Sequence, residues 1–268
     1  MVFCSLSPRC IIWITQDHKS WGDLMTQFQC STKLSKYLRK VVIETGREIK
    51  FRFVADPGGL PGIIAGFKLH PSYILIQLEK GTDWGSPENE HTIAHEATHG
   101  YLIYKLGYSY PKAKRKLTEN EIEHGNLLWM MIDDIVVDRI IQKEGFTPLG
   151  SEYLNMVERE TRAARKGSDR EYDRFSHNPL LKDRFMILRY IVAWGFMRYC
   201  DLEPYARKII NKYLKAFEKS FVEQFAMADQ IREIILQHDI FSVHGHYEAV
   251  EAVTRLWHLE DLIGWQNI

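Results

Sequence analysis

The sequence predicts an α+β fold that is predominantly helical. Two segments in the first third of the chain, 48–56 (EIKFRFVAD) and 72–80 (SYILIQLEK), have the composition and alternation of β-strands. From about residue 87 onward helical patterns dominate, and several helix starts and stops are clearly marked. These observations indicate a small sheet followed by a helical lobe.

The elements before residue 87 follow from local patterns. Residues 20–45 place Leu24, Phe28, Leu34, Leu38 and Val41 or Val42 on one face, which predicts a helix. The segment 57–62 (PGGLPG) separates the two strands as a turn-rich loop. No Gly-Lys-Ser/Thr sequence follows these glycines, so we do not interpret them as a phosphate-binding loop.

Two helices then have recognisable ends. Ser86 is the expected N-cap of a helix that begins at Pro87, runs to about Leu106 and stops at Gly107. Thr118 and Glu121 form a capping box that starts a second helix, which runs to Gly145. Beyond residue 150 we expect helices throughout, with 190–197 as a buried helix and the charged segment 162–179 as an exposed connection.

Composition excludes several classes of protein. The 268 residues are 45% apolar, and 35 basic residues balance 35 acidic ones. This balance gives no reason to expect nucleic acid or an anionic membrane as a partner. No stretch reaches the length of a transmembrane helix, and the apolar patch 10–14 is too short for a signal peptide. The cysteines, which form no Cys-x-x-Cys pair, are expected to be reduced thiols of a cytoplasmic protein, with a disulfide among the first three as the weaker alternative: Cys4, Cys10, Cys30 and Cys200.

The segment 91–102 (HTIAHEATHGYL) places His95, Glu96 and His99 inside the first of these two helices. Histidines four residues apart share one helix face, so a zinc ion at about 2.0–2.1 Å from each ring nitrogen can bridge them. Glu96 can reach a water molecule beside the metal without binding the metal itself. The alternative is an amphipathic helix with two surface histidines. The uncharged flanking residues favour the metal site.

Zinc needs a third protein ligand, and the best source is 130–138 (MMIDDIVVD). Asp134 and Asp138 share a helix face, so Asp134 is the expected ligand and Asp138 the acceptor of a histidine ring N–H. Asp133 points about 100° away and is the fallback ligand. His124 is a further possibility. The alternative role for these aspartates is pairing with Arg139 or capping of backbone groups.

These motifs resemble the zincin metallopeptidases, and the resemblance covers roughly residues 72–140. The stretch 92–102 (TIAHEATHGYL) is similar to their active-site helix. A later helix with carboxylates at i and i+4 resembles the gluzincin branch. That branch has Glu-x-x-x-Asp where this chain has Asp134-Ile-Val-Val-Asp138, and the shorter side chain puts the third ligand in question.

The resemblance implies further features. A strand beside the active helix would pair with an extended peptide substrate, and 73–79 is in the right place for that edge. A group that stabilises the oxyanion is also required. Five residues qualify by type alone: Tyr172, His177, His244, His246 and Tyr247. A second metal site at His244 and His246 is a weaker interpretation.

The leading hypothesis is therefore a zinc-dependent metallopeptidase that acts on a peptide or protein substrate. Residues 1–109 would form an N-terminal α/β lobe with the active helix, and 110–268 a helical lobe carrying the third ligand. Either such a peptidase has a narrow specificity, or part of the chain, such as 110–117 or 162–178, covers its cleft. One alternative is a non-catalytic, metal-stabilised helical module that binds a partner protein. The other is a metal-dependent hydrolase with a non-peptide substrate. The sequence does not define the oligomeric state.

Overall fold

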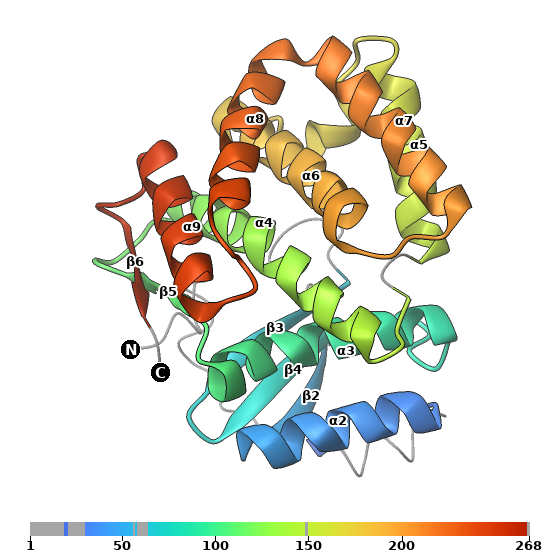
Figure 1. Ribbon diagram of the computed structural model, residues 1–268. Helices are drawn as coiled ribbons and strands as arrows, with labels where there is room; N and C mark the ends of the chain where they lie inside the picture. Colours follow the sequence, from blue (N-terminus) through green and yellow to red (C-terminus); the bar gives the residue numbers. More distant parts are fainter. Residues whose placement is uncertain (1–18, 21–29, 56, 58–63, 148–149, 267–268) are drawn as a thin grey trace.

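A computed structural model describes residues 19–20, 30–55, 57, 64–147 and 150–266 of the chain. Within these ranges the protein is mostly helical with a small sheet, so the predicted α+β class is confirmed (Figure 1). Several predictions concern residues outside the described ranges: Cys4, Cys10, the apolar patch 10–14, most of the loop 57–62 and the first part of the helix 20–45. Cys30 and Cys200 are free thiols.

The main sheet has the strand order β1-β2-β4-β3. Its strands are β1 (Lys19–Ser20), β2 (Glu48–Val54), β3 (Ala65–His70) and β4 (Tyr73–Glu79). β4 pairs with β2 in parallel and with β3 antiparallel, so the prediction that 73–79 is an edge strand is wrong. Five consecutive residues of β4 are buried, as in an interior strand. β3, which the sequence analysis missed, is the outer strand on that side of the described sheet.

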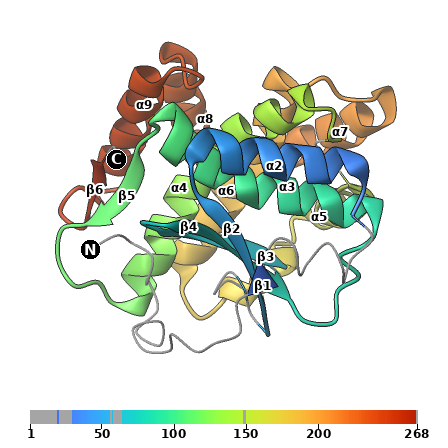
Figure 2. The same cartoon turned by 90° about the horizontal axis from the view of Figure 1, so that it is seen from below.

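Two helices cover one face of this sheet (Figure 2). They are α2 (Thr32–Thr45) and α3 (Pro87–Tyr101), and the hydroxyls of Ser31 and Ser86 cap their first turns. α3 continues as a π-helical turn, η2 (Leu102–Leu106), and ends at Gly107, whose φ of 77° is left-handed. The predicted start and end of this helix are therefore confirmed.

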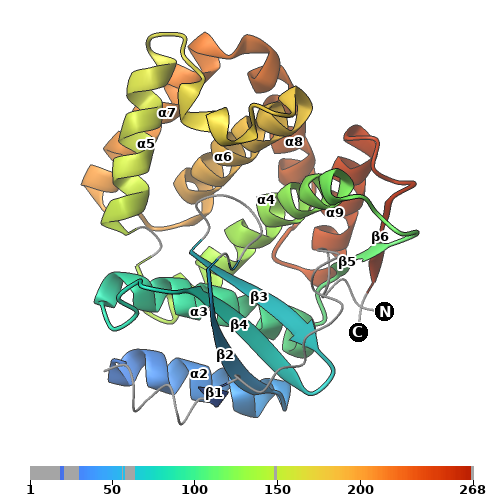
Figure 3. The ribbon, with the colours of Figure 1, turned by 180° about the vertical axis from the view of Figure 1, so that it is seen from behind.

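The remaining helices form a second layer above the sheet and α3 (Figure 3). They are α4 (Glu119–Lys143), α5 (Ser151–Ala164), α6 (Pro179–Tyr199), α7 (Pro204–Ser220), α8 (Val222–Gln237) and α9 (Val243–Leu256). No described helix is both long enough and apolar enough to cross a membrane. The expected exposed connection 162–179 is only partly exposed, because the 3₁₀ helix η3 (Arg170–Phe175) buries Tyr172 and Phe175 in the helical core.

The chain ends in a strand that returns to the segment after α3. β5 (Tyr110–Ala113) and β6 (Ile263–Gln266) form an antiparallel two-stranded sheet. Half of the proposed cover 110–117 is therefore a paired strand. Gly125 in α4 allows this sheet to approach, because a Cβ there would lie 2.8 Å from Cδ1 of Ile263.

Buried apolar side chains form two large clusters, one between the sheet, α2 and α3, and one among the later helices. Ile141 at the end of α4 and Phe146 just beyond it belong to the first cluster. α4 thus contributes to both clusters. The division of the chain at residues 109 and 110 stays a prediction.

Candidate metal centre

The two histidines of the motif lie where α3 passes beneath α4. Nε2 of His95 and Nε2 of His99 are 3.1 Å apart, as expected for residues one helical turn apart that point to the same spot. Thr98, between them, is fully buried, and its hydroxyl contacts both Ala94 O and the Tyr37 hydroxyl at 2.6 Å. The contact with Tyr37 ties this buried side of α3 to α2.

Asp134 completes a group of three converging ligand atoms. Its Oδ1 lies 3.6 Å from Nε2 of His95 and 3.6 Å from Nε2 of His99. Two ligands about 2.0–2.2 Å from one tetrahedral zinc ion lie about 3.3 Å apart. The observed separations, 3.1 Å and 3.6 Å, bracket this value. The donor set, two imidazoles and one carboxylate, also suits zinc, so the residues fit the ion.

A carboxylate holds the other ring nitrogen of each histidine. Nδ1 of His95 lies 2.9 Å from Oδ1 of Asp138, and Nδ1 of His99 lies 2.5 Å from Oδ2 of Asp133. Asp138 is thus where the sequence analysis expected it. Asp133, the fallback ligand, instead lies behind His99 with its carboxylate engaged there. Such outer carboxylates fix the tautomer and orientation of ligand imidazoles.

Aromatic side chains confine the ring of His99. It stacks on Phe67 of β3, with ring centroids 4.5 Å apart and planes 6° from parallel. The ring of Trp129 of α4 lies against it, with ring centroids 5.8 Å apart. The sheet therefore positions the metal-facing imidazole directly, which gives β3 a role at the site that the sequence analysis did not anticipate.

Burial and charge shift the pKa values of the site in opposite directions. Burial alone would lower the pKa of His95, but the charges of Asp138 and Asp134 outweigh it and raise that pKa well above its usual range. Burial would raise the pKa of Asp133, but hydrogen bonds from His246 and His99 lower it to about 2. The zinc-free site thus holds an anionic Asp133 and favours a protonated His95.

Glu96 is buried beside the three converging groups. Burial raises the pKa of its carboxyl group, and the nearby charges of His95 and His99 oppose that shift. A carboxylate with a raised pKa next to two candidate metal ligands is suited to proton transfer. Its role as general base stays a prediction.

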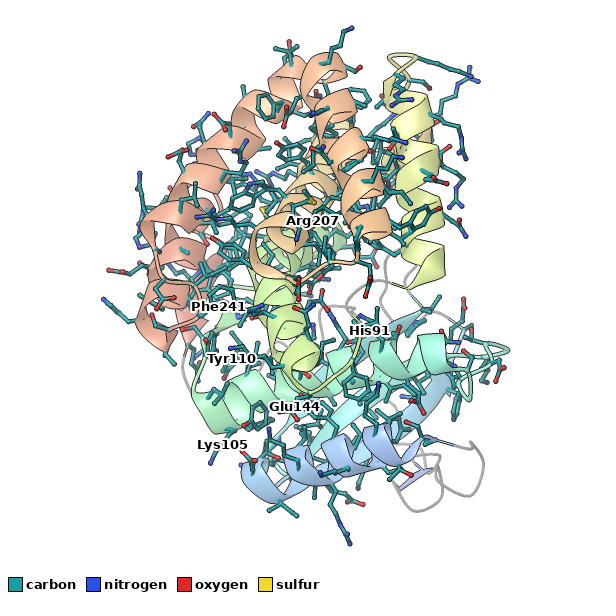
Figure 4. All side chains as sticks on the ribbon, turned by 45° about the vertical axis from the view of Figure 1, so that its right-hand side comes forward. His91, Lys105, Tyr110, Glu144, Arg207 and Phe241 are labelled. Carbon is teal, nitrogen blue, oxygen red and sulfur yellow. The ribbon has the colours of Figure 1, made fainter. Side chains whose placement is uncertain are left out.

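His91, one turn before His95 on α3, was missed by the sequence analysis. Its side chain lies on the side of α3 that faces the helical layer (Figure 4). Nε2 lies 3.6 Å from Oδ1 of Asp138, and His91, His95 and Asp138 form a second group whose ligand atoms are close together. Burial lowers the pKa of His91 to about 4. The sequence did contain a signal for this position, because His91 precedes His95 by four residues, the spacing that also separates His95 from His99.

His124, the other histidine considered as a ligand, belongs to neither of the two groups in the described part of the chain that could hold a metal ion. Burial lowers its pKa to about 4, and the charge of Arg184 adds to that shift. His124 is therefore a neutral core residue.

None of the five residues considered for oxyanion stabilisation belongs to the converging group. Tyr172 is buried with its hydroxyl 3.3 Å from that of Tyr213. His244 is exposed next to Glu248, and the Tyr247 hydroxyl donates to Glu251. The other two are His177, which is exposed, and His246, which is buried and lies 3.2 Å from Asp133 rather than at the ligand atoms.

Tyr153 of α5 is a further polar group near the centre. Its hydroxyl is buried and has no hydrogen-bond partner among the described residues. Burial raises the pKa of this hydroxyl; the charge of Arg189 opposes the shift, and those of Glu160, Asp138 and Asp134 add to it. Nothing in the sequence around 153 signals such a position, because the residue comes from a separate helix.

Known proteins add no family assignment. Comparisons of the chain with models of protein families, with curated proteins and with solved structures found no match.

Proposed function

We propose that this protein is a zinc-dependent metallopeptidase of the zincin type. The observation that carries the proposal is the convergence of His95, His99 and Asp134, with Oδ1 of Asp134 at 3.6 Å from both histidine Nε2 atoms. Each imidazole is backed by a buried carboxylate, which is the usual environment of a metal-binding histidine.

The residues of this chain would divide the chemistry as follows. Zinc, when bound, supplies Lewis-acid chemistry, lowering the pKa of a water molecule to about 7 and polarising the substrate carbonyl. Glu96 would accept the proton of the attacking water and deliver it to the leaving amine nitrogen. Its raised pKa suits both steps, because a general acid and base works best with a pKa near the operating pH.

We propose a peptide substrate because of the His-Glu-x-x-His motif, and not because of a sheet edge that could pair with an extended peptide. β4 has neighbours on both sides and offers no edge for an extended substrate. What favours hydrolysis over a purely structural metal is the donor set, because three protein ligands leave a fourth position for water. His95 and Asp134 also keep 16% of their side-chain surface exposed, as an open site requires. The cytoplasmic location stays a prediction.

The test starts from metal content. We expect about one zinc per chain in the untagged protein, none in His95→Ala, and normal content in His244→Ala, a matched control because that histidine is exposed. Glu96→Gln should keep its zinc and lose hydrolysis of a quenched peptide library. Glutamine preserves the size of the side chain but cannot accept the proton.

Three results would count against the proposal. Full peptide hydrolysis by Glu96→Gln would rule out the mechanism. Zinc bound by four protein ligands, with no hydrolysis by the wild type, would favour the non-catalytic, metal-stabilised module. Hydrolysis of esters or phosphoesters without peptide hydrolysis would move the assignment to another class of metal-dependent hydrolase.

A further inference from the structure

We infer that His246, in the C-terminal helix α9, is a positioning residue of the metal centre that acts through Asp133 and His99. The inference rests on the proposed zinc site. It assigns to α9 a part in metal binding that the His-Glu-x-x-His motif does not contain. His246 touches none of the three ligand atoms, so its effect would reach the metal through the carboxylate of Asp133.

The contacts form a continuous chain from α9 to α3. Nε2 of His246 lies 3.2 Å from Oδ1 of Asp133. The other oxygen of the same carboxylate, Oδ2, lies 2.5 Å from Nδ1 of His99. The opposite nitrogen of His99 is the one that faces His95 and Asp134. One carboxylate therefore joins a metal-facing histidine to a histidine on a helix far along the chain.

Because all three side chains are buried, their polar atoms need partners within the protein. The side chain of His246 is 0% exposed, that of Asp133 2% and that of His99 6%. A buried carboxylate is costly unless each oxygen is paired, and here each oxygen faces an imidazole nitrogen. Oδ1 of Asp133 lies 3.2 Å from Nε2 of His246, although neither ring nitrogen makes a hydrogen bond of regular geometry among the described residues. A buried N–H without an acceptor is costly, so Nε2, next to the Asp133 carboxylate, is the favourable place for a ring N–H.

The surroundings hold His246 in this position. The Tyr108 ring packs edge-on against it, with centroids 4.9 Å apart, and the Tyr108 hydroxyl donates to the carbonyl of Phe241. Gly245, the preceding residue, lies so close to the backbone of Asp239 that a Cβ would be 2.3 Å from that carbonyl oxygen. The first turn of α9 is thus fixed against the loop before it.

Without the His246 contact, Asp133 would lose one of its two partners. It would then be free to rotate, and it would orient His99 less firmly. Loss of such an outer partner lowers metal affinity by about 10–100-fold. The expected consequence is a weaker zinc site in a protein whose ligands are all intact.

A matched pair of amide substitutions tests this role. His246→Gln places its amide nitrogen where Nε2 was, so it can still donate to Asp133. His246→Asn places its amide nitrogen near the position of Nδ1, so it cannot. We expect zinc affinity, measured by competition with a chromophoric chelator, to fall about 10–100-fold in His246→Asn and to stay within about threefold in His246→Gln. Melting temperatures of the zinc-free proteins show whether each variant folds.

His246→Met, which is apolar, should behave like His246→Asn. In an Asp133→Asn background, His246→Asn and His246→Gln should have the same zinc affinity, because the carboxylate that only the glutamine can contact is gone. Equal affinities of wild type and His246→Asn, or equal losses in His246→Asn and His246→Gln, would overturn the inference while leaving the zinc site in place. Absence of zinc binding by the wild type would instead overturn both the site and the role of His246.

Discussion

Asp133 and Asp134 are neighbours in sequence and have different positions at the site. Successive residues on a helix point about 100° apart, so only one of them can face the ligand atoms of α3. Asp134 does so, at 3.6 Å from both histidines, while Asp133 turns to the far side of His99. The helical period therefore separates the proposed ligand, Asp134, from the carboxylate that contacts His99 from behind, Asp133.

The two orienting carboxylates should each affect zinc affinity. Asp138→Asn and Asp133→Asn keep the size of the side chain but remove the negative charge that orients the imidazole and makes it a stronger donor to a metal. We expect each to weaken zinc binding by about 10–100-fold, measured by chelator competition. Asp229→Asn is the control, since that carboxylate is half exposed and paired with Arg232. Unchanged affinity in both variants would mean that the buried aspartates serve only the packing of α4.

Zinc binding should also displace a proton from His95. The pKa of this residue in the zinc-free protein is raised, because the charges of Asp138 and Asp134 outweigh burial. Its protonated form therefore stabilises the zinc-free fold below the unfolded pKa of about 6.5, and this contribution is lost as pH rises through the folded pKa. Zinc requires the neutral imidazole, so the ion and the proton compete.

The apparent zinc affinity should accordingly fall as pH falls, by about tenfold per pH unit below the folded pKa, as expected for release of one proton. Chelator competition between about pH 6 and about pH 8 measures this dependence. Asp138→Asn removes one of the two charges that raise the pKa of His95. In this variant the fall in zinc affinity should therefore begin at a lower pH. An affinity that does not change over this range would show that His95 is already neutral.

At the scale of elements, the sequence predicts best what local chemistry determines. The Ser86 cap, the Thr118 capping box and the stops at Gly107 and Gly145 are short-range signals, and the structure confirms them. The missed elements lack such signals. β3 (AGFKLH) shows no clean alternation. The four-residue strands β5 and β6 are stabilised by pairing between distant segments, and Pro111 and Gly264 would argue against strands there.

The contact between α3 and β4 provides a test of packing. A Cβ at Gly100 would lie 2.5 Å from Cδ1 of Ile74, and two more atoms of that side chain would lie within 3.0 Å. Gly100→Ala should therefore destabilise the protein, because overpacking costs about 1–3 kcal/mol while the gain in helix propensity is about 1 kcal/mol. Denaturant unfolding of the zinc-free protein measures the free energy.

In an Ile74→Ala background the sign should reverse. That substitution removes all three contacting atoms and is itself destabilising, by roughly 2–5 kcal/mol. Adding Gly100→Ala to it should then stabilise the protein, by up to about 1 kcal/mol from helix propensity and partial filling of the cavity. If Gly100→Ala has the same effect in both backgrounds, close packing against Ile74 is not the reason for a glycine at this position.

At the scale of the whole molecule, the centre draws on three separate segments. α3 supplies His95 and His99, α4 supplies the three aspartates, and α9 supplies His246. The motif spacing and the pair of aspartates four apart could be identified in the sequence, because each lies within one helix. The place of α9 could not, since no period links residue 246 to residue 133. The sequence analysis considered His246 for oxyanion stabilisation and, with His244, for a second metal site, but not for this position.

Because the ligands come from two helices in different layers, zinc should stabilise the whole fold. A ligand at 100 times its dissociation constant adds about 2.7 kcal/mol, which in a chain of this size corresponds to a rise in melting temperature of roughly 5–10 °C. Thermal unfolding with and without zinc measures this rise. His95→Ala should show little of it. His244→Ala should match the wild type, because that histidine is exposed.

Thermal unfolding of the Glu96→Gln variant, with and without zinc, also tests the proposed function. If Glu96 is a base and not a ligand, the zinc-bound variant should be stabilised as much as the wild type, although it hydrolyses no peptide. If zinc no longer stabilises the variant, Glu96 binds the metal and fills the position that a reacting water needs. A fourth protein ligand would close the site, and α3 and α4 would then be joined by a structural ion. The thermal shift of Glu96→Gln thus separates a peptidase from a metal-stabilised binding module before any substrate is known.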